Sequence, residues 1–338
     1  MKSRNIVFVR QNTAELLEEE VRLPGPGEVL VKLCVSTISS GTERANLCGN
    51  KSVAWNRPEE KEAVFPRRVG YSSAGIVEQV GEGVEKIKAG DRVALSWSSY
   101  NEYMTIAASN VYKIEKLSFE EASMFHIATF PMAAIRKCRL EMGESAIVMG
   151  MGILGIMAVQ LLKAAGAAPI IAVDPDPAKR EKARACGADF AFDPYGEQFA
   201  ERVKSLTDGG ANVGIEVTGI GAGLEGILDC MACFGRVALL GCTRTSDFTI
   251  DYYRKVHGPG ITLIGAHTNA RPSLDSAPGW WTQKDDMTAL KKLALLGRIR
   301  LSGCVDETHS PAEAPAIFDR LIHDRTFPVV QFDWRTLE

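Results

Sequence analysis

The chain has 338 residues, of which 46% are hydrophobic and 24% charged, and its formal net charge is −3. This length predicts about two domains and a large buried core. The charge balance gives no electrostatic footprint for nucleic acid or for an anionic membrane surface. Eight cysteines spread along so long a chain also exclude a small disulfide scaffold.

The amino-terminal run MKSRNIVFVRQN has too short an apolar stretch for a signal peptide. The longest nearly uncharged stretch, residues 146–162, is shorter than the ~20 residues that span a bilayer. We therefore expect a cytoplasmic protein with neither a membrane partner nor a nucleic-acid partner.

Residues 6–114 show short β-like runs separated by turn residues. This half of the chain predicts a mostly β domain. The clearest runs are EVLVKLCV (28–35), SAGIVEQVG (73–81), DRVAL (91–95) and EYMTIA (102–107).

From about residue 119 the pattern changes to apolar strands that alternate with helical segments, which predicts right-handed βαβ units and a parallel sheet. The expected strands are SAIVMG (145–150), PIIAVD (169–174), ADFAF (188–192), VGIEVTG (213–219), RVALLG (236–241), ITLIGAH (261–267) and a last one within 326–334. The expected helices cover residues 153–166, 177–187, 223–235 and 285–297.

A G-x-G-x-x-G pattern at Gly150, Gly152 and Gly155 follows the first of these strands and opens the first helix at Ile153 and Leu154. In a dinucleotide-binding turn, the first glycine permits the tight bend, the second lets the backbone approach the pyrophosphate, and the third allows close packing of helix on strand. The helix N-terminus then offers amide donors to the phosphates. The alternative is a glycine-rich turn that binds no ligand.

Asp174 ends the next strand, about twenty residues further on. A carboxylate there accepts hydrogen bonds from the adenosine ribose hydroxyls and repels a 2′-phosphate, so the sequence predicts NAD and not NADP. A second G-x-G-x-x-G lies at Gly221, Gly223 and Gly226, but the strand after its helix ends without an acidic residue. We interpret it as a turn and helix-packing feature near the nicotinamide end.

Taken in order, these motifs resemble the medium-chain dehydrogenase/reductase superfamily over nearly the whole chain. The motifs that carry the resemblance are PGPGEVLVK (24–32), Gly70 with SSAGIVEQVG (72–81), VEKIKAGDRV (84–93), GMGILG (150–155) with Asp174, EVTG (216–219) and RVALLG (236–241).

The resemblance implies an α/β fold in which a GroES-like β domain joins a Rossmann domain with a doubly wound parallel sheet. The expected limits are 1–118 for the GroES-like catalytic domain, 119–270 for the NAD-binding domain, and 271–338 for a return to the first, with the active-site cleft between the domains. It also implies cofactor contacts from Thr218, Gly241 and Lys179. Lys179 stands five residues after Asp174, where the alternative is a solvated lysine in a charged helix.

Many members of the superfamily bind a catalytic zinc, but the corresponding positions here carry Ser40, Tyr71 and Ser72, with His126 near the place of the third ligand. Because hydroxyl groups are poor zinc ligands and one histidine cannot hold the ion, we predict a metal-free enzyme. The cysteines of the family's structural zinc lobe are absent. Cys230 and Cys233 lie within the helix predicted over 223–235 and are expected to be core residues.

The run Ser40 to Ala45, together with Gly70 to Ser72, looks like the subgroup that includes bacteriochlorophyllide a dehydrogenase. That resemblance implies alcohol–ketone chemistry. Without a metal, such a site needs hydrogen-bonding groups and a general base.

Thr42 matches the family hydroxyl that starts a proton relay, or it caps the next helix with Glu43 in the first turn. His126 has the ordinary pKa of a base, or it is a satisfied structural histidine. Tyr71 either binds a substrate oxygen or fills the space left by the metal. Glu43 either orients Thr42 or a cation, or is a solvated or capping residue.

Ser40 and Tyr71 are also candidates for substrate binding, as is the aromatic pair Trp280 and Trp281. The two tryptophans follow Pro278 and Gly279 in a loop, where they face a ligand or a subunit partner. The alternative for either is an ordinary place in the core.

The leading hypothesis is an NAD-dependent, metal-independent oxidoreductase that transfers a hydride between the nicotinamide and a secondary alcohol in a polar or cyclic substrate, such as a sugar or cyclitol. One alternative is an NADPH-dependent enoyl or quinone reductase of the zinc-free branch. Another is a dinucleotide-binding protein without catalysis. Because relatives without the structural zinc lobe are often dimers, the resemblance also implies a homodimer.

Overall fold

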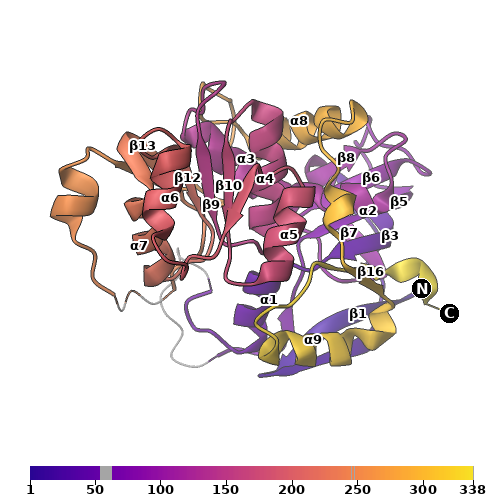
Figure 1. Ribbon diagram of the computed structural model, residues 1–338. Coiled ribbons are helices and arrows are strands. Elements are labelled where there is room, and N and C mark those ends of the chain that lie inside the picture. Colours follow the sequence, from indigo (N-terminus) through magenta and orange to yellow (C-terminus); the bar gives the residue numbers. More distant parts are fainter. Residues whose placement is uncertain (54–62, 245, 247, 338) are drawn as a thin grey trace. The chain divides into compact units, whose positions relative to one another are not determined.

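The computed structural model describes residues 1–53, 63–244, 246 and 248–337, and the chain folds into two compact units (Figure 1). Unit 1 comprises Met1–Ile127 and Val305–Glu338, and unit 2 comprises Ala128–Cys304. The sequence predicted that the chain returns to the first domain at residue 271, whereas residues 271–304 belong to unit 2. Asp286 in this segment is fully buried and ion-paired to Arg136, 2.8 Å away in the same unit.

Unit 1 is built on antiparallel strands, as its short β-like runs predict. In the described residues, one sheet has the order β15-β16-β3-β5-β6-β8 with β7 paired to β3, and a second has the order β2-β1-β4. Only β15 and β16 pair in parallel within these sheets. The strands are β1 (Lys2–Arg10), β2 (Thr13–Glu20), β3 (Glu28–Thr37), β4 (Arg67–Arg68), β5 (Ser72–Val80), β6 (Arg92–Ser96), β7 (Tyr103–Ala107), β8 (Val111–Lys113), β15 (Glu307–His309) and β16 (Val330–Asp333).

Short helices connect these strands. The α-helices are α1 (Ser40–Leu47), α2 (Phe119–Ala122) and α9 (Ala314–His323), and the 3₁₀ turns are η1 (Ala108–Asn110), η4 (Pro311–Glu313) and η5 (Trp334–Thr336). The helix α3 (Phe125–Lys137) begins in unit 1 and continues in unit 2.

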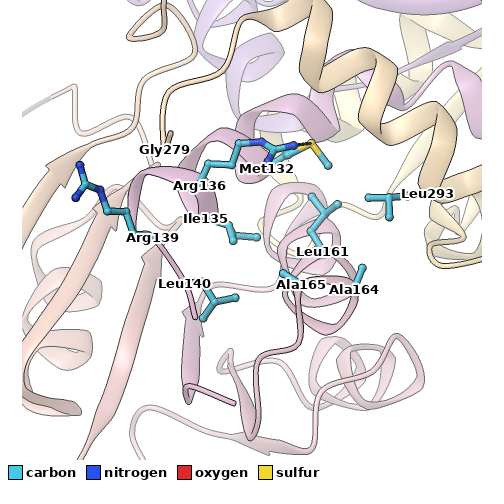
Figure 2. Close-up of a pocket in the computed structure, with 10 residues that line it drawn as sticks. All are labelled: Met132, Ile135, Arg136, Arg139, Leu140, Leu161, Ala164, Ala165, Gly279 and Leu293. Atoms are coloured by element: carbon cyan, nitrogen blue, oxygen red, sulfur yellow. Dashed lines mark hydrogen bonds between the residues drawn. The ribbon is translucent and has the colours of Figure 1, made fainter. Parts of the chain in front are cut away.

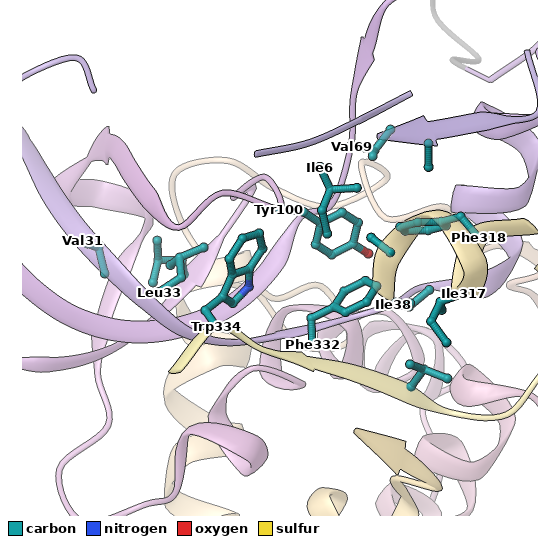
Figure 3. Close-up of a cluster of buried hydrophobic side chains, with 14 of the residues drawn as sticks. Ile6, Val31, Leu33, Ile38, Val69, Tyr100, Ile317, Phe318, Phe332 and Trp334 are labelled. Carbon is teal, nitrogen blue, oxygen red and sulfur yellow. The ribbon is translucent and has the colours of Figure 1, made fainter. Parts of the chain in front are cut away.

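The core of unit 1 joins the two ends of the chain (Figure 3). The ring of Phe8 in β1 meets the ring of Phe318 in α9 edge-on, with 4.9 Å between ring centroids. Tyr100 packs against Phe332 of β16 in the same way, and all four rings are fully buried. The carboxy-terminal segment is therefore part of this core.

Unit 2 contains a parallel sheet with the strand order β11-β10-β9-β12-β13-β14. The first strand in sequence, β9, lies between β10 and β12, so the strand order reverses at its carboxyl end. This is the topological switch point at which doubly wound sheets bind ligands. The strands are β9 (Ala146–Met149), β10 (Ile170–Val173), β11 (Phe190–Phe192), β12 (Ala211–Glu216), β13 (Met231–Leu239) and β14 (Thr262–Gly265).

Right-handed crossovers place α4 and α5 on one face of this sheet and α6 and α7 on the other (Figure 1). The helices predicted over 153–166, 177–187 and 285–297 are confirmed. The helices are α4 (Ile153–Ala165), α5 (Pro177–Ala185), α6 (Phe199–Leu206), α7 (Gly221–Asp229) and α8 (Gln283–Leu295), with short turns η2 (Tyr253–His257) and η3 (Leu301–Cys304).

The helix predicted over 223–235 is wrong in its second half, because α7 ends at Asp229 and β13 begins at Met231. Cys230 caps α7 and is buried, whereas Cys233 lies in the strand and is exposed, so the two are not helical core cysteines. The backbone of β13 passes next to Gly210, where an added Cβ would lie 2.3 Å from the Ala232 nitrogen. Short apolar runs do not distinguish a helix from a buried strand.

Among the described residues, no helix combines the length and the apolar character that crossing a membrane requires.

Candidate functional site

The turn between β9 and α4 in unit 2 has the geometry of a dinucleotide-binding turn. Gly150 has a φ of +101°, a conformation that favours glycine. A Cβ on Gly155 would lie 1.8 Å from the Gly150 carbonyl oxygen, so glycine is required for this close packing. Gly152 caps α4 without a side-chain hydrogen bond, and a Cβ there would meet nothing within 4 Å. The backbone at Gly152 is therefore open to a ligand.

Ile153 and Leu154 form the first turn of α4, directly after Gly152. The first amides of a helix have no partner within the helix and carry its positive dipole end. The turn thus supplies backbone donors that suit a pyrophosphate, and the residues present fit a dinucleotide.

Asp174 follows β10 and is held rigidly beside the turn. Its Oδ2 accepts a hydrogen bond from the Met151 amide at 2.8 Å, and its Oδ1 accepts one from the Asp176 amide at 2.9 Å. A carboxylate has about four lone-pair sites, so acceptor capacity for ribose hydroxyls remains. Lys179 is half-buried in the first turn of α5.

The carboxyl ends of β12 and β13 lie next to the glycine turn. A Cβ on Gly150 would come within 2.9 Å of the Thr218 methyl group, and one on Gly241 within 2.3 Å of the Gly219 nitrogen. Glu216 accepts hydrogen bonds from both the amide and the hydroxyl of Thr218. Burial raises the pKa of Glu216. The structure therefore brings the glycine turn, Thr218 and Gly241 to one edge of the sheet.

The second glycine triplet has a packing role. A Cβ on Gly223 would lie 2.1 Å from the Thr218 Oγ1, and one on Gly221 would overlap the Phe248 ring. A side chain at Gly223 would therefore push α7 away from the Thr218 turn, and one at Gly221 would displace Phe248.

In unit 1, the structure brings Thr42, Tyr71 and His126 together. The Tyr71 hydroxyl donates to the Thr42 Oγ1 at 3.4 Å. The His126 ring packs edge-on against Tyr71, with 5.5 Å between centroids, and against Trp97, with 4.6 Å. His126 is fully buried, whereas Tyr71 is half-buried. Tyr71 is therefore the more accessible of the two rings.

Strand pairing explains this cluster. Ser72 at the start of β5 pairs with Ser96 at the end of β6, so Tyr71 and Trp97 lie side by side just beyond the sheet. The Trp97 amide donates to the Tyr71 carbonyl at 2.9 Å. His126 reaches the two rings from the start of α3.

Glu43 is buried, so a solvated or capping role is wrong for this residue. Its Oε1 accepts hydrogen bonds from the Gly70 amide at 3.2 Å and the Tyr100 hydroxyl at 3.3 Å. Burial raises the pKa of Glu43 to about 8, so the carboxyl is protonated at neutral pH. Thr42 does not cap α1 either, because Ser39 holds the N-cap position.

Models of two families match the chain, one within unit 1 and one within unit 2. The zinc-binding dehydrogenase family matches residues 154–277, and the alcohol dehydrogenase GroES-like domain matches residues 25–116. The chain belongs to the medium-chain, zinc-type alcohol dehydrogenase-like superfamily. As a member of this superfamily it is an alcohol dehydrogenase-like oxidoreductase, and the predicted fold class is confirmed.

Two relatives illustrate the range of this superfamily. An L-threonine 3-dehydrogenase of Pyrococcus horikoshii is 29% identical over 285 residues, 75% of this chain and 79% of that protein. A D-guloside 3-dehydrogenase of Escherichia coli is 25% identical over 331 residues, 92% of this chain and 94% of that protein.

The solved structures of two further proteins share the fold. An alcohol dehydrogenase of Escherichia coli CFT073 complexed with NADH has a TM-score of 0.82 at 19% identity, and the match covers 98% of this chain and 99% of that one. A zinc-binding dehydrogenase of Sinorhizobium meliloti bound to NADP has a TM-score of 0.81 at 18% identity with the same coverage.

Zinc is implied by the superfamily, but the residues at the corresponding positions do not fit it. Ser40 and Tyr71 offer hydroxyls, and the Ser72 hydroxyl donates to the Ser123 carbonyl at 2.6 Å. The remaining group is His126, which is packed between two aromatic rings. Within residues 1–53, 63–244, 246 and 248–337, no group of three or more His, Cys, Asp or Glu side chains could hold a metal.

Trp280 and Trp281 lie in unit 2 against the basic end of α3, so neither is an ordinary core residue. The Arg136 guanidinium lies 3.6 Å from the Trp281 ring centroid, and the Lys137 ammonium 5.0 Å from that of Trp280. Trp280 is 43% exposed.

A cavity of about 340 Å³ in unit 2 is lined by none of the predicted site residues, although Arg136, which lines it, contacts Trp281 (Figure 2). It is mostly apolar, and Figure 2 shows Arg139 directed away from it. Its lining residues are Met132, Ile135, Arg136, Arg139, Leu140, Leu161, Ala164, Ala165, Gly279 and Leu293.

Sequence reasoning missed Trp97 and Tyr100. Both follow β6 in the run SWSSYN, where the signal was an aromatic pair directly after a predicted strand. Trp97 has a φ of +62°, which side chains other than glycine rarely adopt, and it covers His126.

Proposed function

We propose that this protein is an NAD-dependent, metal-independent dehydrogenase that oxidises a secondary alcohol in a polar or cyclic substrate, such as a sugar or cyclitol. The observation that carries the proposal is the hydrogen bond from the Tyr71 hydroxyl to the Thr42 Oγ1. By resemblance, Tyr71 takes the place of a zinc ligand and Thr42 that of the hydroxyl that starts the proton relay. The names of the L-threonine, D-guloside and (R,R)-butanediol dehydrogenases support alcohol chemistry. We propose in addition that the chain is a zinc-free member that resembles the subgroup that includes bacteriochlorophyllide a dehydrogenase.

NAD is held, in this proposal, by the glycine turn, by the first amides of α4, and by Asp174. The buried Asp174 carboxylate favours free ribose hydroxyls over a 2′-phosphate. Lys179 is proposed to support the ribose, while Thr218 and Gly241 lie toward the nicotinamide. Bound NAD supplies the ring carbon that accepts the hydride.

The chain's own residues then have to bind the alcohol and remove its proton. Tyr71 is the accessible hydroxyl: its oxygen accepts the proton of the alcohol while its own hydrogen passes along the hydrogen bond to the Thr42 Oγ1. Thr42 then releases a proton to water, because a hydroxyl both donates and accepts. Ser40 begins α1 and contributes a further hydroxyl to the alcohol. His126 is fully buried, so we assign it a positioning role behind Tyr71, and the protonated Glu43 holds the Gly70 backbone next to Tyr71.

Hydride transfer measured with NAD and with NADP on a panel of sugars, cyclitols and aryl carbinols tests the proposal. We expect turnover of at least one alcohol with NAD, and metal chelators should leave it unchanged. A clear preference for NADPH and reduction of enones or quinones would favour the reductase alternative. Tight NAD binding without turnover would favour a binding protein that lacks catalysis.

We further propose a homodimer that acts on a small-molecule substrate, with Trp280 and Trp281 facing a ligand or the partner subunit. Light scattering that gives the mass of a single chain would contradict the dimer.

A further inference from the structure

Basic side chains gather at the carboxyl ends of β13 and β14 in unit 2. His267 follows β14 by two residues, and Arg244 follows β13 by five. Lys137, the last residue of α3, reaches the end of β14, where its Nζ donates to the Gly265 carbonyl at 3.0 Å. Ligands of parallel sheets bind outside the carboxyl ends of the strands.

Lys137 is the central residue of this group. Its side chain is 7% exposed, and the Trp280 ring covers it at 5.0 Å. An ammonium has three N–H donors, yet in the part of the chain that the structure describes its one hydrogen-bond acceptor is the Gly265 carbonyl. Burial, and then the charge of Arg271, lowers the pKa of Lys137. Two of its three N–H donors therefore remain for another acceptor. A buried positive charge is stabilised best when that acceptor is an anion.

His267 adds a neutral donor. Its Nδ1 accepts a hydrogen bond from the Asn269 amide at 3.2 Å, so the ring proton is on Nε2. Burial lowers the pKa of His267, and the charges of Arg244 and Lys137 lower it further. At neutral pH the ring is therefore neutral, with its proton on Nε2, in the field of the charges of Arg244 and Lys137.

The neighbouring carboxylate is already engaged. Asp286 is fully buried, and it lies 2.8 Å from the Arg136 guanidinium and 3.6 Å from that of Arg271. One carboxylate thus faces two arginines. The charge of Lys137 comes in addition to theirs.

We propose that Lys137, Arg244 and His267 bind an anionic group, a carboxylate or a phosphate, on the alcohol substrate. Asp174 marks the adenosine end of the cofactor at β10, on one side of β9, whereas this basic group lies beyond β12 on the other side. A dinucleotide bound across the switch point directs its nicotinamide toward β12 to β14, where the alcohol must also lie. The inference rests on the proposed function and narrows its substrate class to hydroxy acids, uronates and sugar phosphates.

The first test measures anion binding without turnover. Inorganic phosphate and acetate are titrated into the NAD-loaded protein while the side-chain ¹⁵N signals of His267 are followed. We expect a saturable shift. The Kd of the anion should rise at least tenfold in the double variant that combines Lys137→Met with Arg244→Gln, whereas the single variant Lys137→Arg should keep part of the affinity. The matched control changes two exposed residues of unit 2, Lys292→Met with Arg298→Gln, and should leave the shift unchanged.

The second test compares turnover of D-glucitol, D-gluconate and D-glucitol 6-phosphate with NAD. A preference for gluconate identifies a carboxylate, and one for the phosphate identifies a phosphoryl group. Whichever preference over glucitol is found should fall at least tenfold in the double variant, while the Kd for NAD stays the same.

The inference is overturned if neither anion gives a saturable shift, if the double variant binds as the wild type does, or if the anions compete with NAD, because the group would then serve the cofactor. It is also overturned if glucitol is used as well as both anions. Failure of NAD binding or of all turnover, with anion binding intact, would count instead against the proposed function.

Discussion

At the Gly150–Gly155 turn the proposed binding surface is the backbone itself, whereas around Tyr71 the candidate groups are side chains that come from three segments of unit 1. The turn needs glycines because a Cβ on Gly155 would overlap the Gly150 carbonyl. The cluster needs Thr42 from α1, Tyr71 from the position just before β5, and His126 from α3. A backbone site depends on a few residues that cannot change, while a side-chain site can change its chemistry without changing the fold.

The largest effect is expected at the glycine turn. The variant Gly155→Ala places a methyl group 1.8 Å from the Gly150 oxygen, so either the turn or α4 must move. We expect NAD affinity to fall by about 100-fold, which corresponds to ~2.7 kcal/mol and lies near the upper end of the ~1–3 kcal/mol that overpacking costs. Calorimetric titration with NAD measures the loss.

The matched control for this variant is Gly226→Ala in the second triplet. A Cβ there would meet the Met149 methyl at an ordinary 3.5 Å, so NAD affinity should stay close to that of the wild type. Equal effects of the two substitutions would mean that the first triplet has no special role.

At the side-chain cluster, Tyr71→Phe removes the hydroxyl that donates to Thr42. If this hydroxyl moves the proton, kcat should fall by about 10²-fold or more while the Kd for NAD stays unchanged. Steady-state kinetics together with NAD titration separate the two quantities. The control Tyr103→Phe, on β7 of the same unit, should leave kcat unchanged. An unchanged kcat in Tyr71→Phe would contradict the proposed proton path.

Asp174→Asn tests which dinucleotide the turn prefers. The amide keeps one acceptor oxygen but loses the negative charge that disfavours a 2′-phosphate. The ratio of kcat/KM for NAD to that for NADP should fall by about 10-fold, since one charge-assisted contact is worth ~1.5–3 kcal/mol. An unaltered ratio would assign the preference to other residues.

Glu43→Gln should have the smallest effect on cofactor binding and turnover, and its effect on stability depends on pH. Because the folded pKa of about 8 exceeds the ordinary value of 4.5, the folded state keeps a proton that the unfolded state loses between these values. The stability contributed by Glu43 is thus fully present below pH 4.5 and is lost as pH rises toward 8, by about 1.4 kcal/mol per pH unit.

Glutamine does not titrate and can still accept from the Gly70 amide and the Tyr100 hydroxyl. Melting curves should therefore show variant and wild type close together at pH 5, with the variant several degrees more stable at pH 8.5. A difference that does not grow with pH would contradict the buried, protonated carboxyl.

The sequence predicted the turn but only part of the cluster. Gly150, Gly152, Gly155 and Asp174 were recognisable because backbone requirements impose a spacing along the chain. Trp97 and Tyr100 were not recognised, because their partners depend on which strands pair. The pairing of β5 with β6 cannot be predicted from the residues of either strand alone. For Glu43 the sequence left open a role in orienting Thr42 or a cation and a solvated or capping role, because a charged residue is rarely fully buried, whereas the protonated carboxyl lies in the core.

The strand β13 of unit 2 is a second feature that depends on strand pairing and not on its own sequence. Its apolar residues 231–235 have no period that separates a strand from the end of a helix, and the pairing with β12 beside Gly210 decides the matter. The long, strongly patterned helices α4 and α8 were found with nearly their observed bounds.

The core of unit 1 has a consequence for how the protein is made. Phe318, Phe332 and Trp334 complete that core, and all three lie after residue 304. During synthesis, unit 2 is a continuous segment that can fold as soon as it has left the ribosome, while unit 1 must wait for the last residues of the chain. The amino-terminal strands, although made first, are therefore the last part of the protein to reach their final packing.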